Sequence, residues 1–294
     1  MRAALGFFLL SAPVLLACSG IMEVVTGKYD LHGPPGADFA AGQGYSQTTT
    51  GEFKDGAVTM KVMGQSIQGK MSMRLRESWT LEGLSPTSAR VSFREKVTEQ
   101  KMQMGTERDE STEEAPLHGK VVVLERQGAG RFVARLEQGE ASAELQKELD
   151  SFAREWGNLD QKYPTERVAV GATWNVPAEL VAYELVSRDV LSVTGTAAYT
   201  FDEKVVWNGE NCARISYRLN DIQVESWDQE LSLPMKMRIG GQGTVLRSLK
   251  RHVDVQDSFE GTIELLTEGH IDGTPAGAVT EMKINAGLVS TTTR

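Results

Sequence analysis

The stretch GKMSMRLR at residues 69–76 alternates apolar and polar side chains one by one. Successive side chains of a β-strand point to opposite faces of the sheet, so this period of two predicts a strand with one buried and one wetted face. Sheets buried on one face only are typically antiparallel. Because the same alternation recurs at residues 58–62, 212–219 and 235–239, we expect a mainly β, antiparallel protein.

Turn-forming residues separate these expected strands. They are Asp55-Gly56, Asn208-Gly209, Asn220-Asp221, Gly240-Gly241, Asp272-Gly273 and the segments 83–86 and 128–130. For residues 240–243 (GGQG), a kink or bulge within a bent strand is the alternative. The charged run ERDESTEE at residues 107–114 predicts an exposed loop. Several strands between the turns are long, such as residues 66–82 and 190–207. Long strands joined by tight turns favour a curled antiparallel sheet or partial barrel over a compact sandwich.

Two stretches have the period of a helix instead. Residues 142–159 carry an apolar stripe at steps of three and four, which predicts one central amphipathic helix. Its members are Leu145, Leu149, Phe152, Trp156 and Leu159. Pro177 suits the first turn of a short second helix over residues 177–185.

The long helix divides the body, residues 46–294, into β-rich halves at about 46–138 and 187–290. The halves could close into one sheet wrapped around the helix or form two similar subdomains. One sheet is the preferred hypothesis, since a single helix stripe needs a concave apolar face to bury it. Residues 18–45 are rich in Gly and Pro without a sustained apolar period, which predicts a tether. Val24, Val25 and Tyr29 could still form a short strand or pack on the body.

The chain starts with the features of an export signal. Arg2 gives a positive start, and residues 3–17 (AALGFFLLSAPVLLA) are apolar apart from Ser11. This run is too short for a permanent membrane helix but fits the core of a cleaved signal peptide, residues 1–17. It ends at Leu15-Leu16-Ala17-Cys18.

That ending resembles the lipobox of bacterial lipoproteins. The resemblance implies that the Cys18 thiol takes a diacylglycerol, and that the new amino end takes an acyl chain such as palmitate. Ser19, in place of an aspartate, resembles proteins sorted to the outer membrane, facing the periplasm, if the source cell has two membranes. An ordinary cleavable signal followed by a chance cysteine is the alternative.

The body has a second, looser resemblance. Residues 170–177 (VGATWNVP) and 208–213 (NGENCA) are similar to uncharacterised secreted β-rich domains of bacteria. The likeness implies architecture only.

No constellation of residues predicts catalysis, a metal or a cofactor. The four histidines lack zinc-ligand spacing and are expected in exposed loops, and a Gly-x-Ser-x-Gly elbow is absent. Asp254 and Asp257 are an odd number apart, so on a strand they are expected to face opposite ways. With Cys18 lipidated, Cys212 would be a core residue or a quiet thiol. A net charge of −9 argues against nucleic acid as the main partner.

Methionine is the most informative residue of the body. Pairs at i and i+2 place two thioethers on one face of a strand. The pairs are Met71/Met73, Met102/Met104 and Met235/Met237, with Met60 as a further member. Three interpretations compete: ordinary core filling, an adaptable apolar surface for a lipid, acyl chain or peptide, and a Cu(I) site.

The preferred functional hypothesis is a non-catalytic envelope lipoprotein, held to a membrane through Cys18, that binds an apolar ligand in a concave sheet. A structural or assembly protein that recognises another envelope protein is the alternative. An enzyme with an unrecognised site is the third hypothesis. Ligand, partner and oligomeric state stay open.

Overall fold

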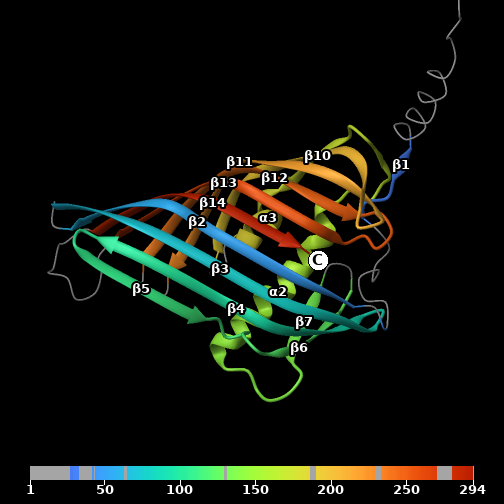
Figure 1. The fold of residues 1–294 in the computed structure, drawn as a ribbon, viewed down its shortest axis with the longest axis horizontal. Coiled ribbons are helices and arrows are strands. Elements are labelled where there is room, and N and C mark those ends of the chain that lie inside the picture. The colour runs from blue at the N-terminus through green and yellow to red at the C-terminus, as the bar shows by residue number, and fades with distance from the viewer. Residues whose placement is uncertain are drawn as a thin grey trace, which may run out of the picture.

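The structure is a computed structural model that describes residues 27–32, 42, 44–62, 65–128, 131–185, 190–228, 233–269 and 280–293. It is mainly β (Figure 1), which confirms the predicted fold class. The first strands are β1 (Lys28–Tyr29), β2 (Gly44–Val62), β3 (Gln65–Ser85), β4 (Ser88–Met104), β5 (Glu107–Glu114), β6 (Val121–Arg126) and β7 (Phe132–Leu136). The later strands are β8 (Val168–Ala169), β9 (Thr173–Pro177), β10 (Val190–Trp207), β11 (Glu210–Asp228), β12 (Leu233–Ser248), β13 (Asp254–Gly269) and β14 (Thr280–Thr293).

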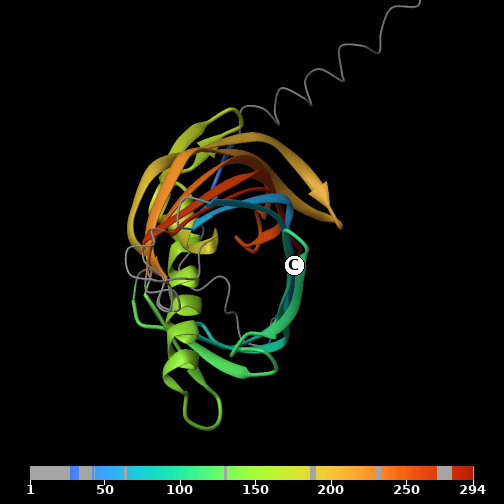
Figure 2. The same cartoon turned by 90° about the vertical axis from the view of Figure 1, so that its left-hand side faces the viewer.

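Twelve of these strands form one antiparallel sheet in the order β7-β6-β4-β3-β2-β14-β13-β12-β11-β10-β9, with β5 beside β4. Strands β1 and β8 form a separate pair. The two expected halves therefore join in one continuous sheet, through the pairing of β2 with β14. Figure 2 shows that the sheet curls and that helix α2 (Ala143–Leu159) runs along its open side.

Helix α2 forms as the apolar stripe predicts. The Ser142 hydroxyl accepts a hydrogen bond from the Leu145 backbone N–H at 3.2 Å and caps the helix start. The stripe packs on the inner face of the sheet, where Phe152 meets Phe93 edge-on with ring centroids 5.1 Å apart. This helix core also contains Trp79, Leu81, Val91 and Leu124, among others. The second helix, α3 (Ala178–Leu185), confirms the other prediction.

Within the described ranges, neither helix is long and apolar enough to cross a bilayer.

Two of the predicted turns are β-bulges inside long strands. The register of β2 against β3 shifts between Phe53 and Gly56, and Asp55 has a φ of 52°. The register of β11 shifts between Leu219 and Ile222, with Asp221 at a φ of 50°. Asp tolerates left-handed backbone in a bulge as well as in a turn, so the local signal is the same. Each bulge adds twist and lets the strand curl without ending.

Other turn predictions have mixed outcomes. Asn208-Gly209 forms the β10–β11 turn, with φ values of 48° and 79°. Gly240-Gly241 is not a turn, because residues 240–243 lie within β12. The Asp272-Gly273 prediction lies outside the described residues.

The glycines of β12 make room for an aromatic ladder. Trp174, Tyr199, Tyr217 and Phe259 stack across β9, β10, β11 and β13, with successive ring centroids 5.9, 5.2 and 6.2 Å apart. The ladder crosses β12 at Gly243, where a Cβ atom would overlap the Tyr217 ring and the Ser258 carbonyl. Glycine occupies position 243 because the neighbouring rings leave no room for a side chain, and not because the chain turns there.

The charged run at residues 107–114 is strand β5, not a loop. It pairs with β4 from Val97 to Met104, and all its side chains are exposed. The prediction is wrong because main-chain hydrogen bonds alone hold an edge strand in the ladder, whatever its side chains are.

The ladder predicts a large effect of one methyl group. Gly243→Ala forces the added carbon into the Tyr217 ring, and overpacking of this kind costs about 1–3 kcal/mol of unfolding free energy. The control is Gly240→Ala, three residues away on the same strand, where a Cβ would meet nothing within 4 Å. Urea unfolding monitored by tryptophan fluorescence compares the two midpoints. A Gly243→Ala midpoint equal to that of the control would contradict the described packing.

Candidate functional site

Part of the predicted tether packs on the body. Strand β1 pairs with β8, and the Tyr29 ring meets Phe201 edge-on at 5.6 Å. Leu31 is fully buried in the C-terminal core, the cluster built mainly from β9–β13. Residues 27–32 thus dock on the body, which confirms the alternative that Tyr29 forms a short strand and packs there, and β2 already starts at Gly44. Residues 18–26 and 33–41, and Cys18 with them, lie outside the described residues.

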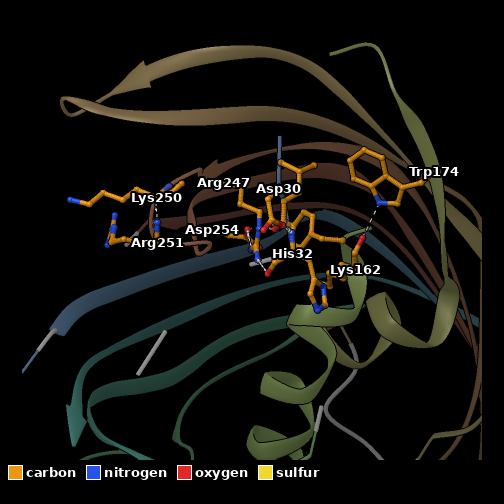
Figure 3. A network of polar contacts seen from close by, with 11 residues as sticks. Asp30, His32, Lys162, Trp174, Arg247, Lys250, Arg251 and Asp254 are labelled. Atoms are coloured by element: carbon orange, nitrogen blue, oxygen red, sulfur yellow. Dashed lines mark hydrogen bonds and ion pairs between the residues drawn. The ribbon is translucent and has the colours of Figure 1, made fainter. Parts of the chain in front are cut away.

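A buried arginine holds this segment (Figure 3). Arg247 of β12 donates from Nε to the Leu31 carbonyl at 2.5 Å and from Nη2 to the His32 carbonyl at 3.5 Å. Its Nη1 donates to Asp254 Oδ1 at 2.7 Å, and the Tyr163 hydroxyl donates to the same oxygen at 2.8 Å. The guanidinium lies over the Tyr163 ring, 3.8 Å from its centroid.

This arginine network joins three distant parts of the chain. The Arg247 side chain is 3% exposed and that of Asp254 is 13%, so each charge depends on the other for its stabilisation. Burial, followed by the nearby Asp254 carboxylate, raises the pKa of Tyr163 well above its ordinary value and keeps its proton in place. The N-terminal segment, the connection after α2 and the β12–β13 hairpin thus meet at one fixed point. This is a structural site, and its partners leave the guanidinium no free face for a substrate.

Sequence reasoning missed Arg247, although a signal exists. In β12 the inward positions are Met235, Met237, Ile239 and Val245, and Arg247 continues the same phase beside them. An arginine at a position where alternation demands an apolar residue indicates a buried ion pair.

The two aspartates of β13 face the same way, contrary to the sequence prediction. The register of β12 against β13 shifts between Leu246 and Arg247, which places one extra residue in β13. This bulge cancels the odd spacing of Asp254 and Asp257. The two carboxylates nevertheless have different partners. Asp254 binds Arg247 and Tyr163, whereas Asp257 accepts a hydrogen bond from the Tyr217 hydroxyl at 3.1 Å.

Histidine and cysteine offer no reactive centre in the described part of the chain. His32, His118 and His252 are half-buried and not exposed as predicted, and His118 Nδ1 accepts the Lys96 N–H at 3.2 Å. Cys212 is buried, and burial raises the pKa of its thiol, which opposes thiolate chemistry. Among the residues described, none of the His, Cys, Asp and Glu side chains gather in threes that could hold a metal ion.

An ion-pair cluster ties α2 to the sheet. Lys96 Nζ lies 3.5 Å from Glu77 of β3 and 3.7 Å from Glu148 of α2. Burial opposes the Lys96 charge, but Glu77, Glu148 and Glu155 outweigh it and raise its pKa above the ordinary value. Glu148 also accepts the Leu117 backbone N–H at 3.2 Å. The charged groups of this cluster thus find their partners within the protein, and their contacts fix the position of the helix on the sheet.

The methionines separate into two groups. Met235 and Met237 are 3% and 8% exposed and belong to the C-terminal core, so ordinary core filling explains them. The other five are half-buried and lie outside the core clusters. They are Met60, Met71, Met73, Met102 and Met104.

These five methionines share one side of the sheet. Met71 pairs directly with Met102, and Met60 pairs with Ile67, which is 41% exposed. The Met104 sulfur lies over Gly69, its cross-strand partner. Cross-strand partners point to the same face of a sheet. We call Met60, Ile67, Met71, Met73, Met102 and Met104 the methionine face.

The methionine face lies on the inner side of the curled sheet. Strand β3 keeps an unbroken period of two between Ile67 and Leu81, so Met71 and Met73 point the same way as Trp79. Trp79 packs on Trp156 of α2, with ring centroids 6.1 Å apart. The helix thus covers one end of these strands, and the methionines occupy the inner face beyond it.

The arginine network predicts a sharp loss of stability when its cation is removed. Arg247→Met leaves Asp254 and two carbonyls without their donor, which costs about 3–5 kcal/mol of unfolding free energy. Amide hydrogen exchange at residues 28–32 should also accelerate, because the segment loses its main holding contact. Arg238→Met is the matched control on the same strand, since Arg238 pairs with Asp221 in an exposed position. Its unfolding midpoint should stay near that of the parent, and equal losses in both variants would refute the assignment.

Comparisons with known proteins assign no family to the chain. No family model matches it, and no curated protein matches it. Among solved structures, it is similar to lipovitellin with a TM-score of 0.38 and 9% identity over 85% of this chain, and it spans only 25% of the lipovitellin chain. A DUF1329 family protein from Desulfovibrio piger has a TM-score of 0.13 and 10% identity, covering 81% of this chain and 84% of its own. A domain assigned to outer membrane lipoprotein sorting in Vibrio parahaemolyticus has a TM-score of 0.12 and 10% identity, covering 84% and 85%. Likenesses this weak establish neither a family nor a function.

Proposed function

We propose that this chain is a lipid-anchored protein of the bacterial envelope that binds an apolar ligand, such as an acyl chain, on its methionine face. The observation that carries the proposal is the group of five half-buried methionines in register on the inner side of the sheet, outside the core clusters. The two methionines of β12 show how the same side chain looks when it is only core filling.

Methionine suits a surface that is covered only part of the time. Its unbranched thioether side chain adapts to irregular partners and is polarizable, so it can pack on chains of differing shape. Apolar side chains gathered on a sheet face otherwise stay in contact with water, which soluble proteins avoid over large areas unless a partner covers them. An acyl chain would gain about 0.8 kcal/mol for each methylene that leaves water.

The N-terminal segment supports the membrane part of the proposal. Residues 1–17 would be the signal peptide, Cys18 the lipid-bearing first residue, and the residues from Cys18 up to the docked segment 27–32 the tether. The body is held from Gly27 onward by β1 and the arginine network. At about 3.3–3.6 Å per residue, a tether of this length reaches at most about 30 Å. The body would therefore stay close to the bilayer, where acyl chains are found.

Binding is tested with the double variant Met71→Ser/Met102→Ser, which removes a directly opposed pair of thioethers. We expect it to bind the neutral hydrophobic dye N-phenyl-1-naphthylamine about tenfold more weakly than the parent, because about 1–2 kcal/mol of apolar contact is lost. Fluorescence titration measures the affinity. The control, Leu191→Ser/Val206→Ser, removes two apolar side chains that are 66% and 71% exposed elsewhere.

The control should bind the dye like the parent. Equal affinity of all three proteins, or a parent that binds no dye, would reject the methionine face as a binding surface. A parent that binds no apolar probe would instead favour the assembly-protein hypothesis.

The anchor has a separate test. Cys18→Ser removes the sulfur that would carry the diacylglycerol, so the expressed protein should move from the membrane to the soluble fraction. Its intact mass should lack the added acyl groups that mass spectrometry finds on the parent. A serine variant that still sediments with membranes and has the processed mass of the parent would contradict lipid attachment at this residue.

A further inference from the structure

The methionine face continues into the edge strand β5. Asp109 pairs with Met102, Glu107 with Met104 and Glu113 with Thr98. Since cross-strand partners share a face, these three carboxylates stand on the same inner side of the sheet as the methionines. The apolar surface thus ends in a row of negative charge.

The charges of β5 are unevenly compensated. On the outer face, Glu110 pairs with Lys101 at 3.3 Å, whereas Glu114 lies 4.0 Å from His118, which carries a positive charge only when its imidazole is protonated. On the inner face, Glu107, Asp109 and Glu113 have no ion-pair partner among the described residues, and all three are exposed. The inner-face cation Lys96 is engaged with acidic residues of β3 and α2. A row of three carboxylates without a lysine, arginine or histidine partner among the described residues therefore borders the methionine face.

Charged side chains on an edge strand also discourage pairing with other molecules. Protection of the sheet edge requires charged side chains on β5, but it does not require the two faces of the strand to differ in charge. Here a lysine compensates Glu110 on the outer face, whereas the three inner carboxylates have no such partner among the described residues and adjoin the half-buried methionine face. This arrangement matches a ligand that has an apolar part and a positive part.

We infer that the ligand of the methionine face is a single-chain cationic amphiphile. This rests on the proposed function and adds the charge of the ligand. Strands β2 to β5 lie at successive spacings of about 4.8 Å, so the surface from Met60 to Asp109 is roughly 14 Å wide. That width is comparable to the length of a dodecyl chain. The chain lies on the thioethers, the positive head meets the β5 carboxylates, and an anionic head in the same place is repelled.

The experiment compares three dodecyl probes below their micelle concentrations by isothermal titration calorimetry. The probes are dodecyltrimethylammonium, dodecyl maltoside and dodecanoate, which carry positive, neutral and negative heads on one chain. We expect the parent to bind the cationic probe about tenfold more tightly than the neutral one and to bind the anionic probe most weakly. Raising the salt concentration should reduce the preference, because the carboxylates are exposed.

A pair of variants assigns the preference to one face of β5. Glu107→Gln/Asp109→Asn/Glu113→Gln should bind the cationic and neutral probes equally, with the neutral affinity unchanged. The control Glu110→Gln/Glu114→Gln removes carboxylates from the outer face and should keep the preference of the parent. Because these side chains are exposed, circular dichroism should show parental folds for both.

The possible failures are distinguishable. A parent that binds the neutral and cationic probes equally, or a triple variant that keeps the preference, overturns this inference and leaves the proposed function standing. A parent protein that does not bind the neutral probe overturns the proposed function itself. Tighter binding of a lysine-rich amphipathic peptide than of the cationic probe would assign the surface to a protein partner and also overturn the inference.

Discussion

The pairing of β2 with β14 is the interaction on which the rest of the structure depends. It joins the first and last long strands of the body at the middle of the sheet, along a register from Thr48–Thr293 to Lys61–Glu281. Without it, the chain would have two shorter sheets, each with an additional open edge. With it, one curled surface extends over both halves and has a common inner side. Contacts so distant in sequence form slowly, because a long loop must close before the hydrogen bonds compensate for its lost entropy.

The common inner side is divided among three kinds of surface. Helix α2 and its aromatic partners cover the N-terminal strands toward one end. The aromatic ladder and the glycines of β12 fill the C-terminal strands with packed side chains. The methionine face remains between the helix and the far end of β2–β4 and is only partly covered. Packing therefore fixes most of the sheet and leaves one adaptable area, beside which the unpaired carboxylates of β5 lie.

Much of this fold was predictable because the local signals are strong. The period of two locates the long strands, and the stripe from Leu145 to Leu159 locates α2 almost to its ends. The bulges were not predictable, since Asp55-Gly56 and Asn220-Asp221 use the same left-handed geometry that a turn uses. Strand β5 was missed because its place in the ladder comes from β4 and not from its own side chains. Arg247 was missed because its partners, Leu31 and Tyr163, lie far from it in sequence.

The docking of Leu31 on Arg247 has a consequence for the order of events during synthesis. The two residues are 216 positions apart, and synthesis from the N-terminus delivers Leu31 long before Arg247. Strand β1 can pair with β8 earlier, but the contact of Arg247 with the Leu31 carbonyl forms only when the β12–β13 hairpin arrives. Burial of Leu31 by Arg247 would consequently mark the arrival of the last part of the C-terminal core.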